Sequence, residues 1–229
     1  DDWMPNSIEN TFWYGYHETF DINTGLPLPT SGTVHDYTTR RAKWEIEWAM
    51  RTLPLDLNRV YMTGHSMGGI GSTFLGILMH DKIAATWTTS AKYDFSFLTD
   101  PNSANIWNSG SNERANSGDI MGGTVPVNLP CSEGLPVYDR LNANKLVQML
   151  KAEAMPVMIG FHGKNDIVVG WTEKLGFYNA MNANKHGGQF FFDSGVHNRT
   201  GGEFVNNQDI NALNRYRLNQ SYPAFSNST

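Results

Sequence analysis

Cysteine is nearly absent from this chain of 229 residues, in which Cys131 is the single example. One thiol excludes an internal disulfide framework and cannot build a cysteine metal site, so we expect neither a metal nor a cofactor. Charged residues make up only 17% of the chain, the net charge is -5, and Lys and Arg do not cluster, which argues against a nucleic-acid surface. No apolar run approaches the roughly 20 residues that a membrane-spanning helix needs. The sequence therefore predicts a protein without a membrane span that does not bind nucleic acid.

The chain is long and apolar enough to bury one large core. Its 229 residues, 40% of them hydrophobic, fit a single α/β domain over 1–229 better than two small domains. The N-terminal segment DDWMPNSIEN is acidic and lacks the features of a signal peptide. We expect a secreted or periplasmic protein whose signal peptide is not present in this chain.

Strands and helices alternate along most of the sequence, as judged from short apolar runs and from apolar residues at helical spacing. Strands are predicted at 11–16, 59–63, 84–89, 156–161 and 188–192, and helices at 37–53, 69–80, 141–154 and 172–185. This order predicts an α/β fold with a doubly wound, mainly parallel sheet. The stretch at about 95–136 is rich in Asn, Ser, Gly and Pro and has no period. We interpret it as an irregular insertion over a site rather than a mobile linker, because the alternation resumes after it.

The segment RVYMTGHSMGGIGS carries the strongest chemical signal. Within it, Gly64 to Gly68 reads GHSMG and fits the G-x-S-x-G nucleophile elbow, with a predicted strand before it and a helix after it. We expect a Cβ atom at either glycine to collide where the helix folds back on its strand. Ser66 would then stand above the sheet beside the free N–H groups of the helix. The alternative is a glycine-rich turn that binds a phosphate or only packs.

A serine hydroxyl becomes a good nucleophile only when a histidine takes its proton and a carboxylate orients that histidine. The elbow predicts the chain order Ser, acid, His, with each residue at the carboxyl end of a later strand. The strand at 156–161 runs into HGKND, and the strand at 188–192 runs into DSGVH. Asp166 and His197 are therefore the predicted partners of Ser66.

Several of these residues have other interpretations. Asp166 could cap the following helix, and His197 could be an ordinary loop histidine. Asp193 is the other carboxylate near the base, and we expect it to be held in local hydrogen bonds. His65 lies next to the nucleophile and should point away from it, while His162 is expected to brace the acid loop.

Three segments resemble the catalytic blocks of α/β-hydrolase esterases: RVYMTGHSMGG, PVMIGFHGKNDIVV and FFFDSGVHN. They are most similar to the polyhydroxyalkanoate depolymerase and feruloyl or acetylxylan esterase groups, over about 11–200 apart from the insertion. The resemblance implies an α/β-hydrolase fold with Ser66 as nucleophile, Asp166 as orienting acid and His197 as general base. It also implies that the N–H of Met67 is one oxyanion donor. The implied enzyme is a serine carboxylesterase that acts through an acyl-enzyme on a small-molecule or polymer-linked ester, such as a feruloyl, acetyl-polysaccharide or short-chain ester.

The chain departs from the family pattern in the second oxyanion donor. That donor usually follows an earlier strand, often in a His-Gly sequence, and no such block precedes Ser66. We weigh three explanations, in order of preference. The chain is the C-terminal part of a longer protein whose N-terminal strands lie outside it, or Tyr16 and His17 supply the donor, or the chain is an inactive relative.

Two other functions compete with the esterase. A serine peptidase of the prolyl-oligopeptidase type shows the same three blocks, but it needs an anchor for a peptide terminus and usually a large gating domain. A non-catalytic binding module with the hydrolase scaffold would explain the missing donor. It would not, however, require a serine, a carboxylate and a histidine in register, so we predict the esterase.

Overall fold

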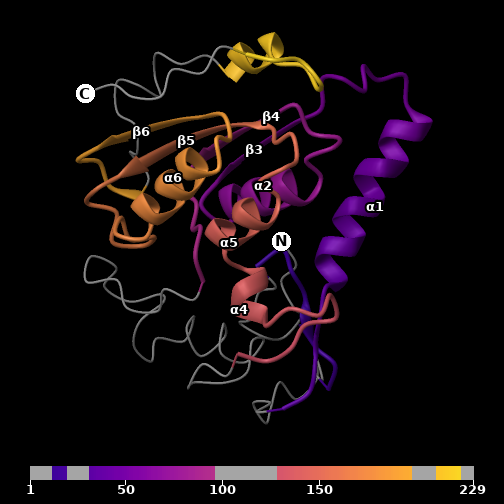
Figure 1. Cartoon of the computed structure of the whole chain (residues 1–229), viewed down its shortest axis with the longest axis vertical. Coiled ribbons are helices and arrows are strands. Elements are labelled where there is room, and N and C mark those ends of the chain that lie inside the picture. The colour runs from indigo at the N-terminus through magenta and orange to yellow at the C-terminus, as the bar shows by residue number, and fades with distance from the viewer. Residues whose placement is uncertain (1–11, 20–30, 96–127, 198–209, 223–229) are drawn as a thin grey trace.

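A computed structural model describes residues 12–19, 31–95, 128–197 and 210–222, and every structural statement below refers to these residues (Figure 1). Its centre is a four-stranded parallel sheet with the strand order β3-β4-β5-β6. The strands are β3 (Tyr61–His65), β4 (Ala85–Thr89), β5 (Val157–Gly163) and β6 (Gly188–Asp193). Because all four run the same way, their carboxyl ends lie at one edge, where the predicted site residues follow β3, β5 and β6.

Helices cover the sheet on both faces. The helices of the described residues are α1 (Tyr37–Thr52), α2 (Met67–Leu78), α4 (Val137–Arg140), α5 (Ala143–Met149), α6 (Lys174–Ala183) and the 3-10 helix η2 (Ile210–Arg215). Figure 1 shows α2, α5 and α6 on one side of the sheet and η2 on the other. From β3 onward, the predicted alternation of strands and helices around a parallel sheet is thus confirmed.

Strand β5 shows why the chain needs a cover on both faces. Met158 and Gly160 face the helix side, where Met158 packs with α2, α5 and α6, and Gly160 approaches Tyr93. Ile159 and Phe161 face the η2 side and pack with Leu213 and Tyr216. Side chains alternate along a strand, so an apolar strand such as this one has to be buried on both faces.

The predicted first strand is wrong. Of TFWYGY, Thr11 lies outside the described residues, and residues 12–14 form a turn with φ angles of 47° at Phe12 and 63° at Trp13. The strand β1 (Tyr16–His17) pairs antiparallel with β2 (Val34–His35) in a separate two-stranded sheet. Aromatic composition favours a strand, but two consecutive residues with positive φ cannot be extended. The described parallel sheet therefore begins with β3.

The helix predicted at 141–154 is shorter in the structure, where only α5 lies within that range, and a separate short helix, α4, precedes it. Asn142 separates them because its side chain accepts a hydrogen bond from the N–H of Lys145 (3.2 Å) and so begins a new helix. Of the predicted insertion, residues 96–127 lie outside the described residues. The described end of this segment is packed against the protein. Leu129 and Cys131 are buried, and the backbone of Cys131 pairs with that of Val34 in β2 as an isolated parallel β-bridge.

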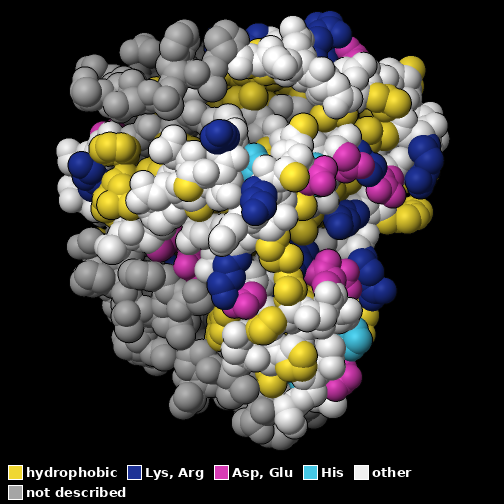
Figure 2. Space-filling model, in the orientation of Figure 1, with side chains coloured by type: hydrophobic (Ala, Val, Ile, Leu, Met, Phe, Trp, Pro, Cys, Tyr) yellow, Lys and Arg dark blue, Asp and Glu magenta, His cyan; other side chains and the backbone are white. Residues whose placement is uncertain are grey.

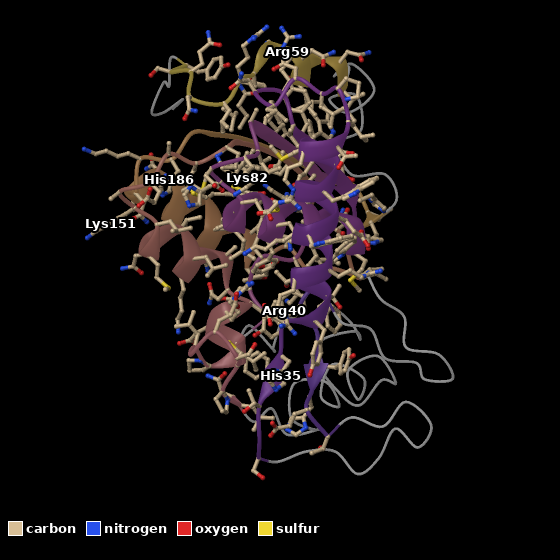
Figure 3. The ribbon with its side chains drawn as sticks, turned by 90° about the vertical axis from the view of Figure 1, so that its right-hand side faces the viewer. His35, Arg40, Arg59, Lys82, Lys151 and His186 are labelled. Atoms are coloured by element: carbon tan, nitrogen blue, oxygen red, sulfur yellow. The ribbon has the colours of Figure 1, made fainter. Side chains whose placement is uncertain are left out.

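Helix α1 lies along one side of the molecule and is poorly buried. Leu53, the last residue of the helix predicted at 37–53, is 45% exposed, and Trp44 is 60% exposed. Figure 2 shows hydrophobic side chains interspersed with charged ones on this side. An ion pair links α1 to the turn after α2, since Lys82, labelled in Figure 3, lies 3.6 Å from Glu47. No helix in the described ranges is long and apolar enough to cross a membrane.

Candidate active site

The turn from β3 into α2 holds Ser66 in a strained conformation. Its φ of 53° and ψ of -118° are rare for a residue with a side chain, and such strain clusters at functional sites. A Cβ at Gly64 would lie 2.1 Å from the carbonyl oxygen of Gly68, so position 64 requires glycine. The same expectation for Gly68 is wrong, because nothing lies within 4 Å of a Cβ there. The second close approach involves Gly69, where a Cβ would lie 2.9 Å from the carbonyl oxygen of Thr89.

The serine is fixed to the neighbouring strand through its backbone. The N–H of Ser66 donates a hydrogen bond to the carbonyl oxygen of Thr89 at the end of β4 (2.8 Å). Met67 is the first residue of α2, so its N–H belongs to the first-turn groups that have no acceptor within the helix. This N–H lies directly beside the serine, at the positive end of the helix dipole.

The structure brings the three predicted residues together in a continuous chain of hydrogen bonds. Ser66 Oγ lies 2.8 Å from His197 Nε2, and His197 Nδ1 lies 2.8 Å from Asp166 Oδ2. The other oxygen, Oδ1, accepts the backbone N–H groups of Val168 and Val169, both at 2.9 Å. A carboxylate at Nδ1 favours the tautomer that carries its proton there, which leaves Nε2 free to accept the serine proton. Asp166 therefore makes local turn bonds and also orients the histidine.

Hydrogen bonds keep Asp166 ionised. Its burial would by itself raise the pKa, because a low-dielectric environment disfavours the charged form. The bonds from His197, Val169 and Val168 outweigh burial, and they hold the pKa below its ordinary value of 3.8. At neutral pH the side chain is a carboxylate that can stabilise a positive charge on the histidine.

The loops after β5 and β6 are joined through their backbones. The N–H of Lys164 donates to the carbonyl oxygen of Asp193 (2.7 Å), and that of Asn165 donates to Gly195 (3.0 Å). A Cβ at Gly163 would lie 2.1 Å from the carbonyl oxygen of Gly195, so glycine permits this approach. As expected, the carboxylate of Asp193 is held locally, since Oδ1 accepts the N–H of Gly195 (2.7 Å). The acid and the base are thus carried by one connected unit.

The two other histidines near the elbow and the acid loop have different surroundings. His65 does not point away from the site: its ring centroid lies 5.1 Å from that of His197, and its Nδ1 lies 2.8 Å from Thr89 Oγ1. His162 is buried, and its Nδ1 lies 2.9 Å from the hydroxyl of Tyr178 on α6. Burial, and secondarily the positive charge of Lys174, hold the pKa of His162 well below its ordinary value of 6.5. His162 is therefore neutral and joins β5 to α6.

Trp13 contacts the elbow, which the sequence did not indicate. Its indole N–H donates to the carbonyl oxygen of Met67 (2.8 Å), and a Cβ at Gly71 would lie 2.4 Å from its ring. The turn at 12–14 therefore packs against the first turns of α2. Tyr16 and His17, the second of the three explanations weighed for the missing oxyanion donor, lie in β1.

Apolar side chains border the acid and the base. Ile167 directly follows the acid and is 61% exposed, while Val196 directly precedes the base and is 47% exposed. The ring of Trp171 lies 4.9 Å from that of Phe192, and Lys164 Nζ lies 4.6 Å above the Phe192 ring. Among the described residues, no group of three or more His, Cys, Asp or Glu side chains could hold a metal ion.

The sequence matches no protein-family model and no curated protein, but the structure is similar to several solved hydrolases. One is the acylaminoacyl peptidase of Pyrococcus horikoshii, with a TM-score of 0.53 and 15% identity over 83% of this chain and 29% of that chain. Another is the fluorophosphonate-binding serine hydrolase F of Staphylococcus aureus, with a TM-score of 0.51 and 22% identity over 76% of this chain and 61% of that chain. A third is the dipeptidyl peptidase 4 of Porphyromonas gingivalis, with a TM-score of 0.52 and 16% identity over 72% of this chain and 20% of that chain.

The fold is that of the α/β-hydrolases. This chain spans less than two thirds of each of these three proteins. At such low identity the likeness concerns the fold alone, so any activity has to be argued from the side chains at the carboxyl edge of the sheet.

Proposed function

We propose that the protein is a serine hydrolase that cleaves carboxylic esters through an acyl-enzyme. The observation that carries this proposal is the unbroken chain from Ser66 Oγ through His197 to Asp166, with 2.8 Å at each step. A nucleophile bonded to a base, with the base bonded to a carboxylate, is the arrangement that activates a hydroxyl for attack on a carbonyl carbon.

In the first half of the reaction, Ser66 Oγ forms a bond to the ester carbonyl carbon while His197 Nε2 takes the serine proton. The carbonyl oxygen becomes negative and accepts the N–H of Met67. Asp166 stabilises the positive imidazolium at Nδ1. The intermediate then breaks its C–O bond to the alcohol, and His197 returns the proton to the leaving oxygen.

In the second half, water attacks the acyl carbon on Ser66. His197 takes a proton from that water and then gives a proton to Ser66 Oγ as the acid leaves. The low pKa of Asp166 supports this cycle, because the carboxylate remains available as the counter-charge at neutral pH. Over the whole cycle the ester and one water molecule are consumed, the alcohol and the acid are produced, and the three side chains return to their starting state.

The substrate proposed is an ester with an apolar part, whether a small molecule or a group linked to a polymer. The side chains of Ile167 and Val196 support this proposal because they are exposed apolar residues next in sequence to the acid and the base. Short-chain acyl groups, acetyl groups on a polysaccharide and feruloyl groups all meet this description.

The proposal is tested with nitrophenyl acetate, nitrophenyl butyrate, methyl ferulate and an aminoacyl nitroanilide. We expect hydrolysis of the esters, and the Ser66→Ala variant should be about 10⁶-fold slower. Ser194→Ala is the matched control, because this exposed serine lies in the base loop, and it should be as active as the unaltered protein. Ester hydrolysis that survives Ser66→Ala would end the proposal, and faster cleavage of the anilide than of the esters would favour a peptidase.

A further inference from the structure

Ser90 links the end of β4 to the base. It follows β4, is fully buried, and has a φ of 52°. Its hydroxyl donates a hydrogen bond to the backbone carbonyl oxygen of His197 (3.0 Å), and its N–H donates to the carbonyl oxygen of Phe161 in β5 (2.9 Å).

Two consecutive residues at the end of β4 thus form hydrogen bonds with the backbones of the nucleophile and the base. Thr89 accepts the N–H of Ser66, and Ser90 holds the backbone of His197. Strand β4 lies between β3, which carries the nucleophile, and β5, which carries the acid. Hydrogen bonds to the end of a central strand therefore help to fix the distance between Ser66 and His197.

The imidazole needs both ends fixed for its Nε2 to stay 2.8 Å from Ser66 Oγ. Asp166 holds the ring at Nδ1, and Ser90 holds the main chain from which the ring extends. If only the ring were held, the backbone at residue 197 could move and swing Nε2 away. A displacement of about 1 Å in a reacting group costs on the order of 10²-fold in rate.

The backbone angle φ at Ser90 favours glycine over serine. A φ of 52° is unfavourable for a residue with a Cβ, and glycine adopts it without strain. What serine adds at this position is the hydroxyl, and that hydroxyl is directed at His197. Strain of this kind persists where the surroundings enforce it, often at functional sites.

We propose that Ser90 is a positioning residue that holds His197 in register with Ser66; this inference rests on the proposed ester hydrolysis. Ser90 does not touch the substrate. Its removal should therefore slow the chemical step without weakening substrate binding.

Two variants separate positioning from stability. Ser90→Ala removes the hydroxyl and keeps the backbone strain, whereas Ser90→Gly removes the hydroxyl and relieves the strain. With nitrophenyl butyrate we expect both variants to lose about 10- to 100-fold in kcat, with KM little changed. The Gly variant should be at least as thermally stable as the Ala variant.

Thr88→Val is the matched control. Thr88 is also buried at the end of β4, and its hydroxyl lies 3.3 Å from the backbone oxygen of Ile159, away from the base. This variant also loses a buried hydroxyl, yet it should keep the kcat of the unaltered protein.

The outcomes are distinguishable. If either Ser90 variant turns over like the unaltered protein, or if only the less stable variant loses kcat, the positioning role is wrong while the proposed function stands. Equal losses in Thr88→Val would also overturn it, because the effect would then be general. If the unaltered protein hydrolyses no ester and a fluorophosphonate does not label Ser66, the proposed function fails, and the positioning role fails with it.

Discussion

Replacing Asp166 by asparagine changes the charge at one atom and little else. In the folded protein, Oδ1 accepts two backbone N–H groups, and asparagine can keep both with its amide oxygen. The amide NH₂ group then faces His197 Nδ1, where the carboxylate Oδ2 lay at 2.8 Å. Two donors cannot share that position, so the imidazole takes the opposite tautomer, with its proton on Nε2, and cannot accept the proton of Ser66.

The expected result is a loss of about 10⁴-fold in kcat, equivalent to about 5 kcal/mol of transition-state stabilisation. The free energy of unfolding should fall by no more than about 3 kcal/mol, the contribution of one hydrogen bond to a charged group. The assay is steady-state hydrolysis of nitrophenyl butyrate, with thermal unfolding followed on the same samples. Circular dichroism checks that the variant is folded at the assay temperature.

Asp193→Asn is the control, since this carboxylate lies close by and accepts the N–H of Gly195 instead of a histidine proton. Its kcat should stay within about threefold of that of the unaltered protein. The reasoning is refuted if a folded Asp166→Asn protein keeps full activity. It is also refuted if Asp193→Asn proves the more damaging change, because Asp193 would then be the acid.

Two further predictions follow from the elbow and from the buried histidine. Gly64→Ala should abolish ester hydrolysis and lower the thermal midpoint, because its Cβ would lie 2.1 Å from a backbone oxygen, whereas Gly68→Ala has open space and should stay folded; equal thermal midpoints for the two variants would contradict this. The depressed pKa of His162 means that the unfolded chain binds a proton there more readily than the folded chain. The free energy of unfolding should therefore decrease as the pH falls below about 6.5. Denaturant titrations between pH 7 and pH 5 should show a smaller decrease in the free energy of unfolding for His162→Gln than for the unaltered protein. The same pH dependence in both proteins would contradict the low pKa of His162.

The parts of the site that follow from local sequence could be predicted. An apolar strand, a glycine, a serine and a helix adjoin one another in the segment around Ser66, so their arrangement depends on a few neighbouring residues. Asp166 and His197 could be named because the carboxyl ends of parallel strands share one edge. The structure brings both within hydrogen-bond distance of their expected neighbours.

The features that were missed depend on contacts between distant segments or on rare backbone angles. Nothing in TFWYGY signals positive φ at Phe12 and Trp13, because residues other than glycine seldom adopt it. The need for glycine at position 69 rather than 68 depends on how closely α2 approaches β4. Ser90 could not be selected, since it lies in none of the three segments that resemble catalytic blocks and its partner His197 is 107 residues away.

If Ser66 is an activated nucleophile, a fluorophosphonate should modify this residue, and the site of modification can be identified. The protein is treated with the reagent, digested, and analysed by mass spectrometry of the peptides. We expect a single adduct on Ser66, which forms far more slowly when His197 is replaced by alanine. An unmodified Ser66, or labelling at the same rate without His197, would contradict this expectation.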